Sequence, residues 1–224
     1  MTLRTQRIPE PQGNALRLPV LRGPAWDAFQ SLRLPAEDAV AWDRTLPEDV
    51  QAWLDGLPET QLPSGRFRLA PSQVGTCIAQ LFEAQDMTPH PALTWLCDDA
   101  RRLADWVADL HGVSSLRLRL EAVFDNACRK FHVDNVLARL ICTYCGPGTQ
   151  LSLDTPDAPA IETVEAGVPI LLKGKMWPQT NEIALKHRSP PIENTGLSRL
   201  VLVLEPLEED DGFGTSYDLR FDAN

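Results

Sequence analysis

The stretch "SLRLRLEAVFD" (residues 115–125) decides the fold class of this 224-residue chain. Apolar and charged side chains alternate strictly along it, which is the pattern of a strand that buries one face only. The apolar set is Leu116, Leu118, Leu120, Ala122 and Phe124, and the charged set is Arg117, Arg119 and Glu121. We therefore expect a half-buried strand here, in a sheet of the antiparallel kind.

On the N-terminal side of this strand, from Ala25 to about Leu110, the period of the sequence is helical. The clearest helix is predicted over 91–112, where apolar residues recur at intervals of three and four and a glycine ends the pattern. A shorter helix is predicted within 47–58, which opens with proline followed by two acids. The first 25 or so residues are rich in proline and arginine, and we expect them to run over the surface without regular structure.

On the C-terminal side the sequence contains further strand patterns, separated by segments rich in turn-forming residues. They lie at 136–145, 168–177, 182–187 and 197–206, with a last short strand predicted at 216–221 after an acidic loop. Helices followed by strands indicate an α+β fold. We expect a double-stranded β-helix, a barrel of the jelly-roll or cupin type, with an N-terminal helical layer packed against it.

This pattern also gives the expected domain organisation. Residues 1–112 would form an extended arm and the helical layer, and residues 113–224 would form the metal-binding barrel, within one structural domain.

The composition excludes several classes of partner. A formal charge of −10 and a pI near 4.8 disfavour nucleic acid and anionic membranes. No apolar run approaches the roughly 18–20 residues that cross a bilayer, and the start of the sequence lacks the apolar core of a secretory signal. Five cysteines without disulfide-type spacing favour a reducing compartment, so we expect a cytoplasmic protein.

The segment "FHVDN" (131–135) places His132 and Asp134 two positions apart, so on an extended chain their side chains share a face. With His187 they give the order H-x-D…H, the ligand order of the two-histidine, one-carboxylate triad of non-haem Fe(II) oxygenases. The same three residues could instead hold zinc, or His132 and Asp134 could form a hydrogen-bonded pair without any metal. The remaining histidines are expected to be structural, and they are His90 and His111.

Arg199 lies twelve residues beyond His187, at the head of the apolar segment "SRLVLVLEP". An arginine in such a strand either extends its head group to solvent or faces a buried anion. The anion could be a ligand, or an acidic neighbour such as Glu205 or Glu182.

Residues 115–206 resemble the superfamily of 2-oxoglutarate-dependent oxygenases, in the ligand order, its place at strand ends and the trailing arginine. The resemblance implies a hydroxylase that uses Fe(II), oxygen and 2-oxoglutarate, with His132, Asp134 and His187 as metal ligands. It implies that Arg199 binds the far carboxylate of 2-oxoglutarate, and it implies no catalytic residue beyond the metal ligands. The chain departs from the pattern at Val201, where many members of the superfamily have serine.

A closer resemblance covers most of the chain. The segments "FHVDN…LARLICTYCGPGTQ" and "KGKMWP…ALKHRSPP" resemble a bacterial family called domain of unknown function 1826. That family has no settled activity, although its members tend to lie near genes of zinc homeostasis. The alternative function is therefore a divalent-metal module, with zinc in a cupin-like barrel, that acts in metal homeostasis without oxygenase activity.

The cysteines offer a second conceivable zinc site, because Cys142 and Cys145 form C-x-x-C and Cys128 lies near the histidine motif. Residues three apart on a strand point to opposite faces, which argues against a shared ion. We expect Cys142 to be a small buried hydrophobe, and we expect Cys77 and Cys97 to lie in the helical core.

Several further residues have expected structural roles, or roles that the sequence leaves open. The glycines of "GPGT" (146–149) favour a hairpin over a phosphate-binding loop, because no helix follows them. Lys173 and Lys175 alternate with apolar residues and are expected to face solvent. Arg139 and Tyr144 could line the barrel, and the sequence leaves open which face of the strand each one occupies.

Overall fold

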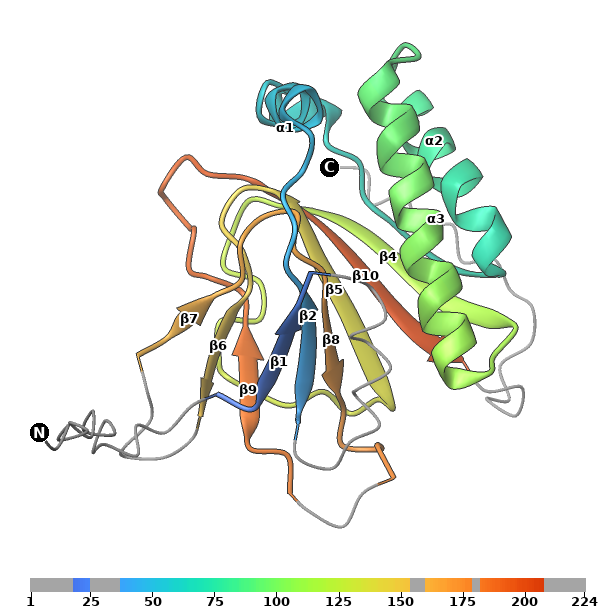
Figure 1. Cartoon of the computed structure of the whole chain (residues 1–224). Coiled ribbons are helices and arrows are strands. Elements are labelled where there is room, and N and C mark those ends of the chain that lie inside the picture. Colours follow the sequence, from blue (N-terminus) through green and yellow to red (C-terminus); the bar gives the residue numbers. More distant parts are fainter. Residues whose placement is uncertain (1–17, 25–36, 154–159, 179–181, 208–224) are drawn as a thin grey trace, which may run out of the picture.

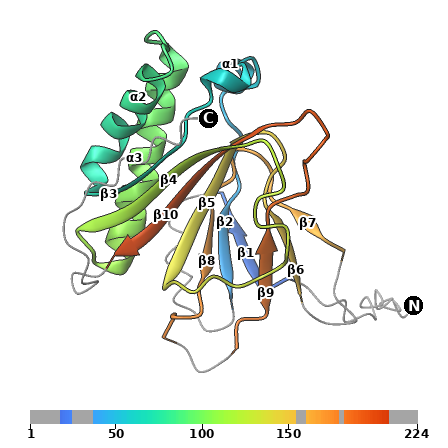
Figure 2. The ribbon, with the colours of Figure 1, turned by 180° about the vertical axis from the view of Figure 1, so that it is seen from behind.

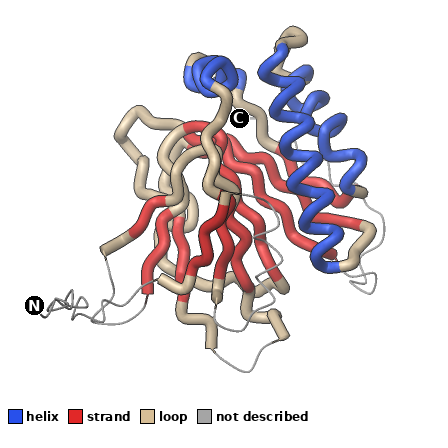
Figure 3. Tube along the Cα trace, viewed as in Figure 1, coloured by secondary structure: helices blue, strands red, loops and turns tan. Residues whose placement is uncertain are grey.

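The computed structural model describes residues 18–24, 37–153, 160–178 and 182–207, which form two β-sheets and a helical layer (Figure 1). The strand predicted at 216–221 lies outside the described residues. The larger sheet stands between the helices on one side and the smaller sheet on the other (Figures 1 and 3).

The larger sheet has seven strands in the order β1-β2-β8-β5-β10-β4-β3. Their bounds are Val20–Gly23 (β1), Ala39–Trp42 (β2), Gly65–Leu69 (β3), Ser115–Val123 (β4), Ala138–Cys145 (β5), Ile170–Lys173 (β8) and Arg199–Leu207 (β10). All neighbouring strands pair antiparallel except β1 and β2, which are parallel. The strand β10 lies inside the sheet, between β5 and β4.

The smaller sheet has three strands in the order β7-β6-β9. They span Gln150–Leu153 (β6), Glu162–Thr163 (β7) and Leu185–Arg188 (β9), and both pairings are antiparallel. The molecule is therefore a mixed α+β protein in which the larger sheet provides most of the framework.

The helices are α1 (Glu48–Asp55), α2 (Val74–Glu83) and α3 (Pro91–His111), with short 3₁₀ turns at Glu59–Gln61 and Pro71–Gln73. The prediction of the long helix is confirmed. Its first turn is capped by the His90 side chain, which accepts a hydrogen bond from the amide of Ala92, and its end is set by Gly112 at φ +67°. None of the helices in the described residues is long and apolar enough to span a bilayer.

The alternation in β4 separates the two faces of the larger sheet. Leu116, Leu118 and Leu120 are buried in the core that the sheet shares with the helices. The arginines between them point to the opposite face, which we call the inner face. Figure 2 shows β4 and β10 from the side away from α3. Part of that face packs on the smaller sheet through a second apolar core, which includes Ile141, Leu151, Ile170, Leu185, Val201 and Val203.

The prediction of a purely helical N-terminal half is wrong, because β1, β2 and β3 belong to the larger sheet. The larger sheet thus takes strands from both sides of residue 112. These strands have four or five residues each and lie toward the edges of the sheet, so they are too short to show an alternating pattern. The short strands β6 and β7 were missed for the same reason.

Two local expectations are also wrong. The "GPGT" turn forms no hairpin, because it carries the chain from β5 in the larger sheet to β6 in the smaller one. Lys173 is only 3% exposed, and its ammonium group lies 5.5 Å from the centre of the Trp177 ring, so it does not face solvent. Burial lowers the pKa of Lys173. Lys175 is exposed as expected.

Candidate metal centre

A single antiparallel bridge brings the two candidate histidines together. The amide of His132 donates to the carbonyl of His187 at 3.1 Å, and the amide of His187 donates back to the carbonyl of His132 at 3.0 Å. His187 belongs to β9, whereas His132 lies in the segment between β4 and β5. Because directly opposite residues project to the same side, the two imidazole rings lie with their centres 4.6 Å apart.

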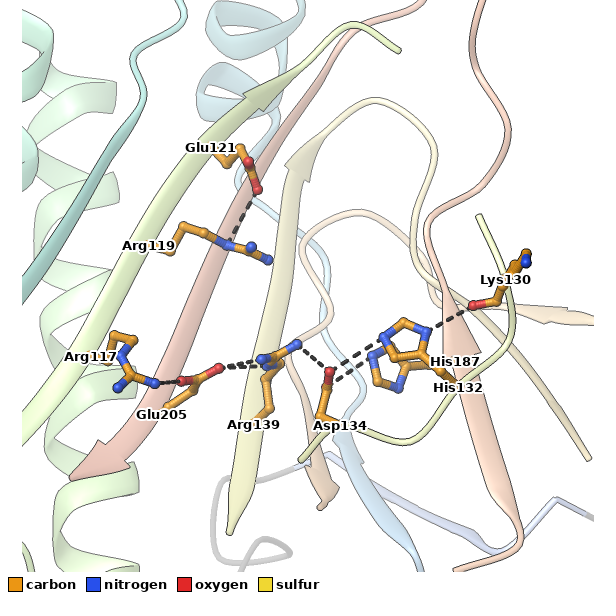
Figure 4. A network of polar contacts seen from close by, with 9 residues as sticks. All are labelled: Arg117, Arg119, Glu121, Lys130, His132, Asp134, Arg139, His187 and Glu205. Carbon is orange, nitrogen blue, oxygen red and sulfur yellow. Dashed lines mark hydrogen bonds and ion pairs between the residues drawn. The ribbon is translucent and has the colours of Figure 1, made fainter. Parts of the chain in front are cut away.

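Asp134 completes the cluster from the same segment as His132 (Figure 4). Its Oδ1 lies 3.3 Å from Nε2 of His132, and its Oδ2 lies 3.1 Å from Nε2 of His187. The amide of Lys175 donates to the carbonyl of Asp134 at 2.8 Å, which fixes the backbone there. One ligand atom from each of the three residues lies within 4.8 Å of the other two, so the structure brings together the residues predicted to hold a metal.

The polar partners of this cluster suit a metal ion. Nδ1 of His132 lies 2.8 Å from the carbonyl oxygen of Lys130, so a proton on Nδ1 would leave the Nε2 lone pair directed at the cluster. Oδ2 of Asp134 is buried and has no hydrogen-bond partner, while Nε2 of His187 lies 3.1 Å from it. A buried acceptor without a donor is what a cation would satisfy.

Arg139 holds the other oxygen of Asp134. Its Nη1 donates to Oδ1 at 2.5 Å, and its Nε donates to Glu205 at 2.8 Å. Glu205 in turn accepts from Arg117 at 2.7 Å. Burial alone would raise the pKa of Asp134, but the contact with His187 and the charge of Arg139 lower it below its usual value. The carboxylate therefore stays ionised, as a metal ligand must.

Sequence reasoning missed this support around Asp134. The alternation in β5 indicates that Arg139 shares a face with Ile141, but it gives no partner for the guanidinium. The acidic partner, Glu205, lies 66 positions away in the sequence, so pairing of distant strands determines this contact.

Arg199 begins β10, is 1% exposed and has neutral partners. Its Nε donates to the carbonyl of Pro147 at 2.6 Å, and its Nη2 donates to Oγ1 of Thr143 at 3.2 Å. Within the described ranges, no carboxylate lies at ion-pair distance from this guanidinium. Glu205, one of the anticipated partners, binds Arg117 and Arg139 instead. Burial lowers the pKa of Arg199 to about 10.

The "GPGT" turn explains how the Pro147 carbonyl reaches Arg199. Gly146 has φ +78°, and a Cβ atom at this position would lie 1.9 Å from the carbonyl oxygen of Ser198. Only glycine permits both this backbone conformation and this approach to the start of β10. The turn therefore positions the Pro147 carbonyl beside Arg199. From the sequence, its glycines indicated only that the chain turns here.

The cysteines take no part in the cluster. Among the described residues, His132, Asp134 and His187 are the only group of three or more potential ligands placed to share an ion. Cys142 is fully buried, as expected, while Cys128 is exposed. Tyr144 does not line the inner face, because its hydroxyl donates to Asp99 of α3 at 2.8 Å. A groove of about 580 Å³ along α2 and α3 is lined by none of the cluster residues.

Comparisons with known proteins agree with this architecture. The family described as "Protein of unknown function (DUF1826)" matches residues 24–205. The dioxygenase for auxin oxidation of rice is 16% identical, with 87% of this chain and 84% of that chain covered and a TM-score of 0.50. The 2-oxoglutarate complex of AtDAO1, dioxygenase for auxin oxidation 1 from Arabidopsis thaliana, is 9% identical, with 85% and 92% covered and a TM-score of 0.52. At these identities the likeness shows a shared fold, and no curated protein matches the sequence.

Proposed function

Because the chain belongs to the DUF1826 family, whose description assigns no activity, we propose from its site that it is a non-haem Fe(II), 2-oxoglutarate-dependent oxygenase. In this proposal the two sheets form a double-stranded β-helix, and the metal lies between them. The observation that carries the proposal is that two features occur together. One is the His-Asp-His cluster, and the other is a buried arginine, Arg199, that forms no ion pair with a carboxylate among the described residues.

His132, Asp134 and His187 would hold the metal, with Nε2 of each histidine and Oδ2 of the aspartate as the ligand atoms. When bound, Fe(II) and 2-oxoglutarate supply oxidation of a substrate by O₂, coupled to decarboxylation of the co-substrate. The chain's own residues orient the ligands. Lys130 fixes the ring of His132 through its carbonyl, and Arg139 fixes the carboxylate of Asp134.

Arg199 would bind the far carboxylate of 2-oxoglutarate. A guanidinium presents a planar fork that can meet a carboxylate bidentately, and burial strengthens that contact. Thr143 places its hydroxyl beside the same guanidinium, so it offers there the hydroxyl that many oxygenases supply from a serine at the position of Val201. A carboxylate would also neutralise a buried charge whose described hydrogen-bond acceptors are neutral oxygens.

A second candidate function is a zinc-binding module without oxygenase activity. The cluster itself favours it, because imidazole and carboxylate ligands bind zinc more tightly than Fe(II). The two functions differ at Arg199, since a metal-binding module needs no anion there.

The first experiment tests the metal. Protein purified without oxygen is titrated with Fe(II) and with zinc, and the His187→Ala variant is compared with His111→Ala, which changes a histidine outside the cluster. We expect His187→Ala to lose the metal and to keep the fold by circular dichroism, while His111→Ala binds normally. A full complement of metal in His187→Ala would contradict the assignment.

The second experiment tests the co-substrate. Arg199→Lys keeps a charge but loses the fork, so binding of 2-oxoglutarate to the Fe(II)-loaded protein should weaken by about 1–3 kcal/mol while metal affinity is unchanged. Arg101→Lys, on the exposed face of α3, is the control. Equal binding of 2-oxoglutarate by wild type and Arg199→Lys would favour the metal-binding module.

A further inference from the structure

Four arginines share two glutamates on the inner face of β3, β4, β5 and β10. Glu121 contacts Arg66 and Arg119, with both nitrogen–oxygen distances at 3.3 Å. Glu205 contacts Arg117 and Arg139 (Figure 4). We call the four arginines the arginine strip. Counting Asp134, which Arg139 also contacts, four positive charges face three negative ones, which leaves an excess of one positive charge.

This arrangement is unfavourable for the fold alone. Arg66 of β3 and Arg119 of β4 are directly opposite in the strand register, and like charges in that position destabilise a sheet. The chain as a whole has a net charge of −10, with 31 acidic residues available, so a positive cluster is contrary to its composition. Charged residues on an edge strand discourage edge-to-edge pairing, which accounts for Arg66. That explanation does not apply to Arg117 and Arg119, because β4 has a neighbouring strand on each side.

Three of the four arginines in the strip are accessible to solvent. The side chains of Arg66, Arg117 and Arg119 are 67%, 50% and 33% exposed, whereas Glu205 is 7% exposed. The buried end of the strip continues into the metal centre, because Arg139 bridges Glu205 and Asp134. An anion on the exposed arginines would therefore lie on the same face as the cluster and connect to it through one side chain.

The exposed end of the strip at Arg117 is distant from the Arg199 site, whereas Glu121 lies opposite Val201, two residues from Arg199. Arg199 and Glu205 lie at opposite ends of β10, six residues apart, and the strand rise places their backbones about 20 Å from each other. In the sheet register Arg117 is opposite Glu205, while Arg199 is opposite Val123. A small molecule such as 2-oxoglutarate bound at Arg199 is too short to contact Arg117. Arg117 and Arg199 therefore suit two different anions.

We propose that the arginine strip is the binding site for an anionic group, a carboxylate or a phosphate, on the primary substrate. This inference rests on the proposed oxygenase function and adds the chemical class of the substrate. Guanidinium groups recognise both anions bidentately, and displacement of the shared carboxylates leaves Arg66, Arg117 and Arg119 available to the ligand. The oxidised carbon would lie between the anionic group and the metal centre.

The test uses inorganic phosphate and acetate as separate probes, by calorimetry and thermal shift on the full chain at low salt. We compare wild type with the double variant Arg117→Gln/Arg119→Gln and with the matched double variant Arg101→Gln/Arg102→Gln on α3, where both arginines are exposed. The strip variant should bind the preferred probe at least about 10-fold more weakly, since it loses two guanidinium groups that would donate charged hydrogen bonds to the anion. The α3 variant should bind like wild type. A preference for one probe identifies the substrate anion as phosphate or carboxylate.

Equal binding by the strip variant and wild type would overturn the inference, and so would an equal loss in the α3 variant. Lysine at both positions (Arg117→Lys/Arg119→Lys) should restore part of the affinity, which separates loss of charge from loss of structure. Fe(II) and 2-oxoglutarate are titrated into the same variants. Normal Fe(II) and 2-oxoglutarate binding without a strip effect rejects only this inference, whereas absent Fe(II) binding in wild type rejects the proposed function.

Discussion

The two faces of the larger sheet differ in how their buried cations are paired with anions. On the helix side, Arg44 meets Asp99 of α3 with two hydrogen bonds of 2.5 and 2.7 Å, and Tyr144 adds a third to the same carboxylate. One cation is matched by one anion there. On the inner face four arginines share two glutamates, and the described hydrogen bonds of Arg199 go to neutral oxygens.

The pKa values of the two buried arginines express this difference. Burial alone lowers the pKa of Arg44, yet the hydrogen bonds and charge of Asp99 raise it above its ordinary value. For Arg199 burial prevails and lowers the pKa to about 10. A buried charge that the protein itself neutralises contributes to structure, whereas one that it leaves without a counter-charge is suited to a ligand.

The largest effect expected on the helix side follows from removing Asp99, which is 1% exposed. Asp99→Ala leaves the charge of Arg44 and the hydroxyl of Tyr144 buried without their partner, so the free energy of unfolding should fall by about 3–5 kcal/mol. Urea denaturation measures this change in the free energy of unfolding. Asp105→Ala, which breaks the exposed pair with Arg101 on the same helix, should cost about 0.3–0.5 kcal/mol.

If the two faces have the different roles proposed here, a destabilised Asp99→Ala protein should still bind metal at low temperature while it remains folded. Loss of the metal from a folded Asp99→Ala protein would remove the distinction between the faces.

A smaller effect is expected from Arg139 on the inner face. Arg139→Gln frees one oxygen of Asp134 and leaves Glu205 paired with Arg117, so the fold should persist. Loss of such a supporting contact typically lowers metal affinity about 10–100-fold. Competition with a chelating dye measures the affinity, and Arg101→Gln serves as the control. Unchanged affinity would show that Arg139 has no part in positioning the ligand.

The smallest effect concerns the thiols and needs no mutation. Four cysteines lie in or against the helix-side core, and burial raises the pKa of Cys77 and Cys142 to about 12 and of Cys97 and Cys145 to about 11. At pH 8 an alkylating reagent should label Cys128 alone, because it is exposed and the other four remain protonated. Mass spectrometry after digestion identifies the labelled site.

The same thiols predict a direction for stability. The unfolded chain ionises them near pH 8.5, before the folded chain does, so the folded state retains more protons above that pH. The free energy of unfolding should therefore decrease as the pH rises from about 8.5 towards 11. Rapid labelling of all five thiols in the native protein at pH 8 would contradict the close packing of the helix-side core.

Much of this comparison could be predicted from the sequence. The alternation of Leu116 to Leu120 with arginine gave both faces of β4, and the period of three and four gave α3. The order His132, Asp134, His187 identified the cluster, because the first two residues lie two positions apart on one extended segment and so share a face. These signals depend on residues close together in the sequence.

What could not be predicted depends on pairing at long range. The bridge between His132 and His187, and the sharing of Glu205 by Arg117 and Arg139, follow from strand order, which no local pattern contains. The strands β1, β2 and β3 are too short for periodicity to reveal. The positive excess on the inner face therefore became visible only in three dimensions.

The place of β10 between β5 and β4 has a consequence for the synthesis of the chain. This strand fills the gap between β4 and β5, although both precede it by more than 50 residues. Translation at roughly 5–20 residues per second therefore leaves two apolar strand edges without their shared neighbour for several seconds. A nascent chain interrupted before residue 199 presents a template for pairing with other chains, and we expect it to aggregate or to require a chaperone.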